Sequence, residues 1–157
     1  MTTRTRTYHW QEPASPPDLP GLEIMRGLLA GEIPPPPMIQ TLGLDLIEVE
    51  TGRVVFAVKP AEYMYNGSGI VHGGFTASMM DSAAGCALHT TLPAGVGYTS
   101  LDLSVKFLRA ITEQSGAIRC VGTLAHVGRR TALAEARMTD ATDRLLASAT
   151  SSLMIFR

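Results

Sequence analysis

The residues whose types and spacing point to chemistry are Asn66, His72, Gly73, Gly74 and Asp81. Gly73 and Gly74 stand where a helix is expected to begin, and the first N–H groups of a helix have no partner within it. The helix dipole favours negative charge at this end, and glycine lets a ligand oxygen reach the amides. Such amides can form an oxyanion hole, which binds the oxygen where negative charge develops.

Asp81 is the second chemical feature, because a carboxylate stands there in the middle of an otherwise apolar stretch. Burying an unpartnered carboxylate is costly, so the residue needs a reason to be there. One explanation is a salt bridge, with Arg109 or Arg137 as the partner. The other is a general base, because an apolar setting raises the pKa of an acid and strengthens its pull on a proton.

The spacing between Gly73 and Asp81 has a geometric consequence. Asp81 is eight residues further along, which is roughly 12 Å along a helix axis. A glycine amide and a catalytic carboxylate must both come within about 3 Å of the same reacting group. One helix cannot bring its own two groups there, but two antiparallel helices across a twofold axis can. The spacing therefore predicts a dimer with shared sites.

These groups are expected on one long helix, from Gly73 to about His89, that is apolar on nearly every face and therefore buried. Hydrophobic alternation predicts strands near residues 44–49, 54–59, 99–108, 116–125, 131–139 and 145–156. Hairpin-length links between consecutive strands make an antiparallel sheet. Because one sheet covers only one side of a helix, the other side needs a partner, which also predicts at least a dimer.

The N-terminal region is expected to differ from the rest, with residues 1–38 forming a polar arm, a short helix and a proline-rich spacer, and residues 39–157 forming the main domain. The helix is indicated by four apolar residues at helical spacing: Leu22, Met25, Leu28 and Leu29. Pro34 to Pro37 stop it, because proline lacks the N–H and disfavours helix in the preceding residue.

Composition limits the classes of function. The net charge of -1 gives no electrostatic reason to expect nucleic acid as a partner. No apolar stretch approaches the roughly 18 residues that span a bilayer. The first ten residues lack the apolar segment of a secretory signal, so we expect a cytoplasmic protein. Cys86 and Cys120 lack metal-site spacing and are interpreted as reduced, buried thiols.

The pattern Asn66-x5-His72-Gly73-Gly74-x6-Asp81, followed by the strand from Tyr98 to Arg109, resembles the hotdog-fold thioesterases of the phenylacetic-acid-degradation (PaaI) type. The resemblance covers about residues 39–156. It implies an α+β hotdog fold, in which an antiparallel sheet of about five to six strands wraps around a long central helix, with a short N-terminal helix in addition.

The resemblance also implies a reaction, the hydrolysis of an acyl-CoA thioester to free acid and CoA. The Gly73 amide, helped by Asn66, would polarise the carbonyl, and Asp81 of the neighbouring subunit would be the base or the nucleophile. Ser100 matches a hydroxyl that places the water, and a one-residue slip would give that role to Thr99, whose side chain points the other way.

The remaining expectations concern the residues around the reacting group. His72 could be a base, a substrate ligand or a residue that shapes the loop, and we favour the shaping role. The residues expected to contact the substrate or its CoA moiety are Gly74, Thr99, Arg109, Arg129 and Arg130. No metal or organic cofactor is implied, and the expected partners are acyl-CoA and other copies of the chain, in a dimer or a dimer of dimers (homotetramer).

Two other functions remain open. A hotdog-fold hydratase or dehydratase would act on acyl thioesters through a catalytic histidine, for which His72 is available. A non-catalytic acyl-CoA sensor would need only the pocket and would leave Asp81 unexplained. The acyl group, aromatic or medium-chain, is expected to enter an apolar tunnel lined by Tyr63, Met64, Tyr65, Phe75 and Met79.

Overall fold

The computed structural model describes residues 3, 5–8 and 18–156. The described helices are α1 (Gly21–Ala30), α2 (Pro37–Leu42) and α3 (Gly73–His89), with short 3-10 turns at Glu62–Met64 and Glu113–Ser115. The described strands are β1 (Asp45–Glu50), β2 (Arg53–Val58), β3 (Gly97–Ser100), β4 (Ser104–Phe107), β5 (Ile118–Val127), β6 (Thr131–Thr139) and β7 (Leu145–Phe156).

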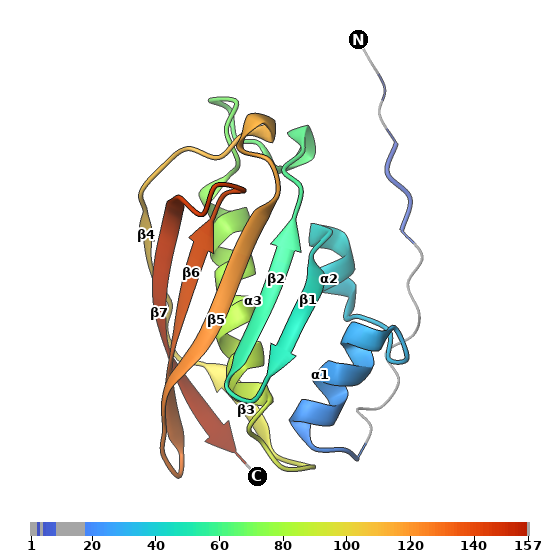
Figure 1. The fold of residues 1–157 in the computed structure, drawn as a ribbon, viewed down its shortest axis with the longest axis vertical. Helices are drawn as coiled ribbons and strands as arrows, with labels where there is room; N and C mark the ends of the chain where they lie inside the picture. The colour runs from blue at the N-terminus through green and yellow to red at the C-terminus, as the bar shows by residue number, and fades with distance from the viewer. Residues whose placement is uncertain (1–2, 4, 9–17, 157) are drawn as a thin grey trace.

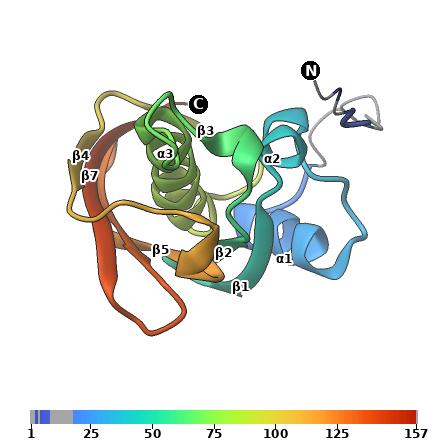
Figure 2. The same ribbon diagram turned by 90° about the horizontal axis from the view of Figure 1, so that it is seen from above.

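The strands form one antiparallel sheet that curls around α3, as Figures 1 and 2 show. The strand order is β1-β2-β5-β6-β7-β3, and β4 also pairs with β7. The helix α3 packs against β2, β5, β6, β7 and β3. The expected hotdog architecture, with its long central helix and short N-terminal helix, is confirmed.

The sheet has seven strands because the strand predicted over residues 99–108 is interrupted. β3 ends with Ser100 opposite Leu153, and β4 starts with Ser104 opposite Thr150. The three intervening residues therefore face only two residues of β7, which is the geometry of a β-bulge. Asp102 fixes this bulge, since its carboxylate accepts the Ser152 N–H at 3.0 Å.

The proline run also differs from the prediction of a simple spacer. α1 ends as expected before Gly31, which adopts a left-handed conformation. Pro37, however, begins α2. Proline is well tolerated at the first position of a helix, where its missing N–H would have had no partner in any case. In Figure 1, α2 lies above α1, and both helices lie next to the β1 edge of the sheet.

The core lies between α3 and the sheet, where Met79, Met80 and Ala83 are fully buried. A Cβ atom added at Gly122 of β5 would lie 2.0 Å from the Ala83 carbonyl oxygen. The small residues of α3 thus allow the close approach that the sequence predicted. The opposite face, with Ser78, Asp81 and Ser82, is only half-buried, so within one chain α3 is not covered on all sides. Among the described helices, none has the length and apolarity needed to cross a bilayer.

Candidate active site

The first turn of α3 exposes one main-chain donor. His72 caps the helix, and its Nδ1 atom accepts the Gly74 N–H at 2.8 Å. The N–H groups of Phe75 and Thr76 donate to the His72 carbonyl at 3.0 and 3.3 Å. Within the described part of the chain, the Gly73 N–H has no hydrogen-bond partner. Of the two glycine amides, Gly73 is therefore the free donor and Gly74 is used in the cap.

The cap also indicates which ring nitrogen of His72 carries the proton. Because Nδ1 accepts a hydrogen bond, the proton of the neutral ring lies on Nε2. The lone pair that a general base would use is thus already occupied at Nδ1. This geometry supports the loop-shaping role for His72. The sequence signal for it is simple, since a residue with a side-chain acceptor directly before a helix is in the N-cap position.

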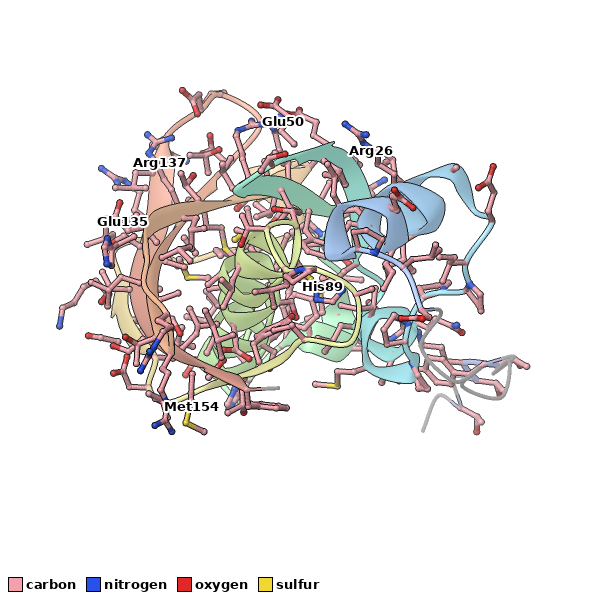
Figure 3. All side chains as sticks on the ribbon, turned by 90° about the horizontal axis from the view of Figure 1, so that it is seen from below. Arg26, Glu50, His89, Glu135, Arg137 and Met154 are labelled. Atoms are coloured by element: carbon pink, nitrogen blue, oxygen red, sulfur yellow. The ribbon has the colours of Figure 1, made fainter. Side chains whose placement is uncertain are left out.

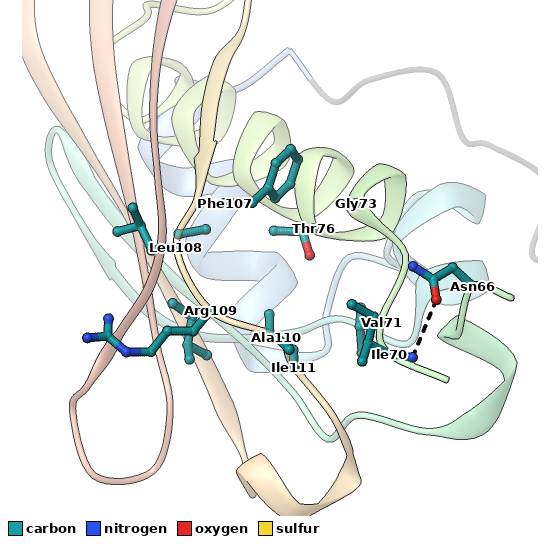
Figure 4. Close-up of a pocket in the computed structure, with 12 residues that line it drawn as sticks. Asn66, Ile70, Val71, Gly73, Thr76, Phe107, Leu108, Arg109, Ala110 and Ile111 are labelled. Carbon is teal, nitrogen blue, oxygen red and sulfur yellow. Dashed lines mark hydrogen bonds between the residues drawn. The ribbon is translucent and has the colours of Figure 1, made fainter. Parts of the chain in front are cut away.

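Asn66 provides a second donor beside Gly73. Its Oδ1 atom accepts the N–H groups of Ser68 and Ile70, at 2.8 and 3.4 Å. These bonds fix the side chain and leave the amide nitrogen without a partner among the described residues. Figure 4 shows this nitrogen pointing toward Gly73. Two N–H groups therefore face the same space at the helix start.

That space is a cavity of about 280 Å³, shown in Figure 4. Asn66, Gly73 and Thr76 line it on the helix side, and the segment after β4 lines it on the other. The Phe107 ring lies close to Gly73, since a Cβ atom added there would be 3.3 Å from the ring. Arg109 lines the cavity as well, but its guanidinium group donates to the Leu145 carbonyl and points away from Gly73.

Asp81 lies further along α3 and has a different partner from those weighed on the sequence. The Ser100 hydroxyl donates to its Oδ1 atom at 2.8 Å. Thr99, the alternative, is exposed like Ser100 but makes no hydrogen bond to Asp81 among the described residues. The salt-bridge explanation is wrong for the described chain: Arg109 bonds to a carbonyl, and Arg137 pairs with Asp143 at 3.3 Å. Figure 3 shows Arg137 on the outer side of the sheet, away from α3.

The candidate residues form three separate groups in one chain. Asn66, His72, Gly73, Gly74 and Arg109 lie around the start of α3. Asp81, Ser100 and Thr99 form the second group, and the continuous helix keeps Asp81 roughly 12 Å from Gly73 along its axis. Arg129 and Arg130 are exposed in the β5–β6 hairpin, and Figure 1 shows this hairpin at the opposite end of the molecule from the start of α3.

The predicted acyl tunnel is wrong. The Tyr63 hydroxyl donates to the Leu42 carbonyl at the surface, and the Tyr65 hydroxyl accepts the Glu113 N–H. Met64, Phe75 and Met79 do line one common space, but its volume is about 10 Å³. That is about the size of one water molecule, so no acyl chain fits there.

The two cysteines are free thiols, as the sequence predicted. Burial raises the pKa of both Cys86 and Cys120 to about 12, so neither is a thiolate near neutral pH. Across residues 3, 5–8 and 18–156, no three His, Cys, Asp or Glu side chains gather in a metal-binding arrangement. Neutral thiols of this kind behave as small apolar groups.

A known protein family matches the part of the chain that carries this site. The sequence model described as "Thioesterase superfamily" matches residues 68–147, from the loop before His72 through α3 to the start of β7. The chain belongs to the thioesterase superfamily. The resemblance to the hotdog-fold thioesterases of the PaaI type is thereby confirmed in family and fold.

Individual relatives agree with the superfamily match. The 1,4-dihydroxy-2-naphthoyl-CoA hydrolase of Listeria monocytogenes is 24% identical over 68% of this chain and 85% of its own length. A phenylacetic acid degradation-related protein of Ralstonia eutropha is 26% identical, with a TM-score of 0.75 over 83% of this chain and 98% of that one. The protein smu.793 of Streptococcus mutans, whose structure contains acetyl CoA, is 23% identical, with a TM-score of 0.66 over 72% and 88% of the chains.

Proposed function

We propose that this thioesterase-superfamily protein hydrolyses an acyl-CoA thioester to a free acid and CoA. The observation that carries the proposal is the pair of free donors, the Gly73 N–H and the Asn66 amide, that face one cavity at the start of α3. Donors arranged in advance around a developing oxyanion are a major source of catalysis in acyl transfer. The naphthoyl-CoA hydrolase relative and the acetyl CoA in a protein of the same fold support CoA thioesters as the substrates.

The proposed site is shared between two copies of the chain, with Gly73 and Asn66 from one and Asp81 from the other. The helix face that carries Asp81 has mainly small residues, including Gly74, Ser78 and Ser82, so a second helix can approach it closely. The edge formed by β3 and β4 leaves Leu101, Phe107 and Leu108 more than half exposed, at 56%, 58% and 51%. Exposed apolar patches of this kind mark interaction surfaces.

In the proposed reaction the thioester carbonyl oxygen accepts from the Gly73 and Asn66 N–H groups. Asp81 takes a proton from water, whose oxygen bonds to the carbonyl carbon. Ser100 holds Oδ1 of Asp81, so Oδ2 is free to accept that proton. The tetrahedral intermediate then expels the CoA thiolate, which takes the proton back from Asp81. Direct attack by the Asp81 carboxylate, followed by hydrolysis of the mixed anhydride, gives the same products.

The geometry at His72 separates this proposal from a hydratase or dehydratase. Those reactions would use the histidine in acid–base chemistry, but Nδ1 of His72 is engaged by the Gly74 N–H. A pure acyl-CoA sensor would not require the hydroxyl-fixed carboxylate at Asp81. Product analysis distinguishes all three: free thiol indicates hydrolysis, a changed double bond indicates hydration, and unchanged bound substrate indicates a sensor.

The test is thiol release from aromatic and straight-chain acyl-CoAs by the wild type and by Asp81→Asn. Loss of a general base typically lowers the rate by about 10²–10⁴-fold. Asp143→Asn is the matched control, because Asp143 has a positive φ, which asparagine tolerates, and lies in the β6–β7 turn. An inactive wild type, or an Asp81→Asn variant with the wild-type rate, would refute the proposal.

A further inference from the structure

A second cavity, of about 230 Å³, lies between the two N-terminal helices and the central helix. Met25 and Leu28 of α1 and Ile39 of α2 form one wall, and Leu46, Phe56 and Cys86 form the other. Figure 2 shows the backbones of α1 and α2 on the same side of the molecule, next to β1. No sequence pattern indicated the cavity, because its walls come from five separate elements.

The cavity lies near the proposed catalytic carboxylate. Cys86 is five residues beyond Asp81 on α3, which is about 7.5 Å along the helix axis and roughly 140° around it. The cavity therefore lies on a different side of α3 from the Asp81 side chain, and an acyl chain must pass along the helix to reach it. The cavity therefore belongs to the copy of the chain that supplies Asp81. The cavity at Gly73 is a different one, at the start of the same helix.

The two cavities differ in chemistry. The Gly73 cavity has polar groups in its lining, including Asn66, Thr76 and Arg109. A pantetheine arm, which carries two amide groups, requires such partners. The second cavity is lined by aliphatic and aromatic side chains, and the neutral thiol of Cys86 behaves as a small apolar group. Its one carboxylate, Asp45, is exposed to solvent.

We propose that the cavity between α1, α2 and α3 binds the acyl group of the substrate, and that this group is apolar and has about six to nine carbons. The inference rests on the proposed function and specifies its substrate class. An apolar cavity of about 150 Å³ holds benzene, so 230 Å³ accommodates a chain of roughly nine carbons or one ring with a short linker. A fused, hydroxylated ring system does not match these walls.

The experiment measures kcat/KM for straight-chain acyl-CoAs from acetyl to dodecanoyl, and for phenylacetyl-CoA. Each buried methylene is expected to raise kcat/KM by about three- to fourfold until the cavity is full. Leu28→Trp and Ile39→Trp fill the cavity from two different helices, and both side chains are only half-buried. Ile24→Trp, on the same helix α1 but outside the cavity, is the matched control.

For the wild type, kcat/KM should rise about 100-fold from acetyl-CoA to hexanoyl-CoA and level off near nine carbons. Both filling variants should lose at least tenfold on octanoyl-CoA and phenylacetyl-CoA while acetyl-CoA changes by less than about twofold. The control should keep the wild-type profile. A wild type that is active but shows the same profile as both filling variants overturns the inference and leaves the proposed function standing. A wild type that releases no CoA from any substrate refutes both.

Discussion

At the start of α3, neighbouring amides have different roles because of one side chain. His72 takes the Gly74 N–H, and the Gly73 N–H is left for a ligand. Asn66 adds its amide only because its oxygen is held by the backbone of its own loop. The proposed chemistry thus depends on His72, which leaves the Gly73 N–H free, and on Asn66, whose own amide is the second donor. Asp81 is the residue that reacts.

The choice between Ser100 and Thr99 can be tested by single substitutions. Ser100→Ala removes the hydroxyl that holds Asp81. A hydrogen bond to a charged group contributes about 1.5–3 kcal/mol, so we expect kcat to fall about 10- to 100-fold with little change in KM. Thr99→Val should stay within about twofold of the wild type. Steady-state kinetics on one good acyl-CoA measures both, and a larger effect at Thr99 would reverse the assignment.

Sequence patterns predicted the donor residues but not their hydrogen bonds. The glycine pair and Asn66 stand out by type and spacing, whereas the choice of Gly73 over Gly74 depends on the rotamer of His72. The salt bridge considered for Asp81 failed for a similar reason, because hydrophobic alternation does not show that Arg137 lies on the outer face of the sheet.

Among the elements, regular patterns were predicted well and local irregularities were not. α3 and the long strands β5, β6 and β7 follow their hydrophobic periodicity closely. The bulge at Asp102 interrupts a strand whose alternation continues in sequence, because hydrogen bonds to β7 impose it. α2 was also missed, since the proline run follows the end of α1 and its last residue, Pro37, starts the next helix.

The β6–β7 turn should show a distinct acid sensitivity. Hydrogen bonds, first from the Thr142 hydroxyl, lower the pKa of Asp140 to about 2. A carboxylate with a lowered pKa contributes stability above its unfolded pKa, near 4, and loses it as the pH falls toward 2. The free energy of unfolding of the wild type should therefore exceed that of Asp140→Asn at pH 6, and the difference should shrink between pH 4 and 2. A constant difference in urea unfolding would contradict this.

For the whole molecule, the shared site predicts complementation between two inactive variants. Gly73→Pro removes the donor and leaves the helix intact, because proline suits the first helical position and the extended backbone of His72 suits a following proline. Losing one such donor lowers kcat by about 10²–10³-fold. Mixed with Asp81→Asn, it should form heterodimers in which one site has both functional groups.

Activity in the mixture is the measurement, with each variant alone as the control. A statistical mixture should recover about a quarter of the wild-type rate, since half of the dimers contain one good site. Heterodimers verified by mass spectrometry that remain inactive would contradict a site shared between copies, even where Asp81 alone proves essential.

The strand order also determines how the chain reaches this structure. β2 pairs with β5, with Arg53 opposite Thr123, and all of α3 lies in the chain between them. Such distant pairing forms slowly, on a scale of milliseconds to seconds in small domains. Until β5 pairs with β2, the apolar side of α3 lacks the strand that packs against it most closely. Refolding yield after dilution from urea should therefore fall as protein concentration rises, because exposed apolar helices aggregate before the sheet closes.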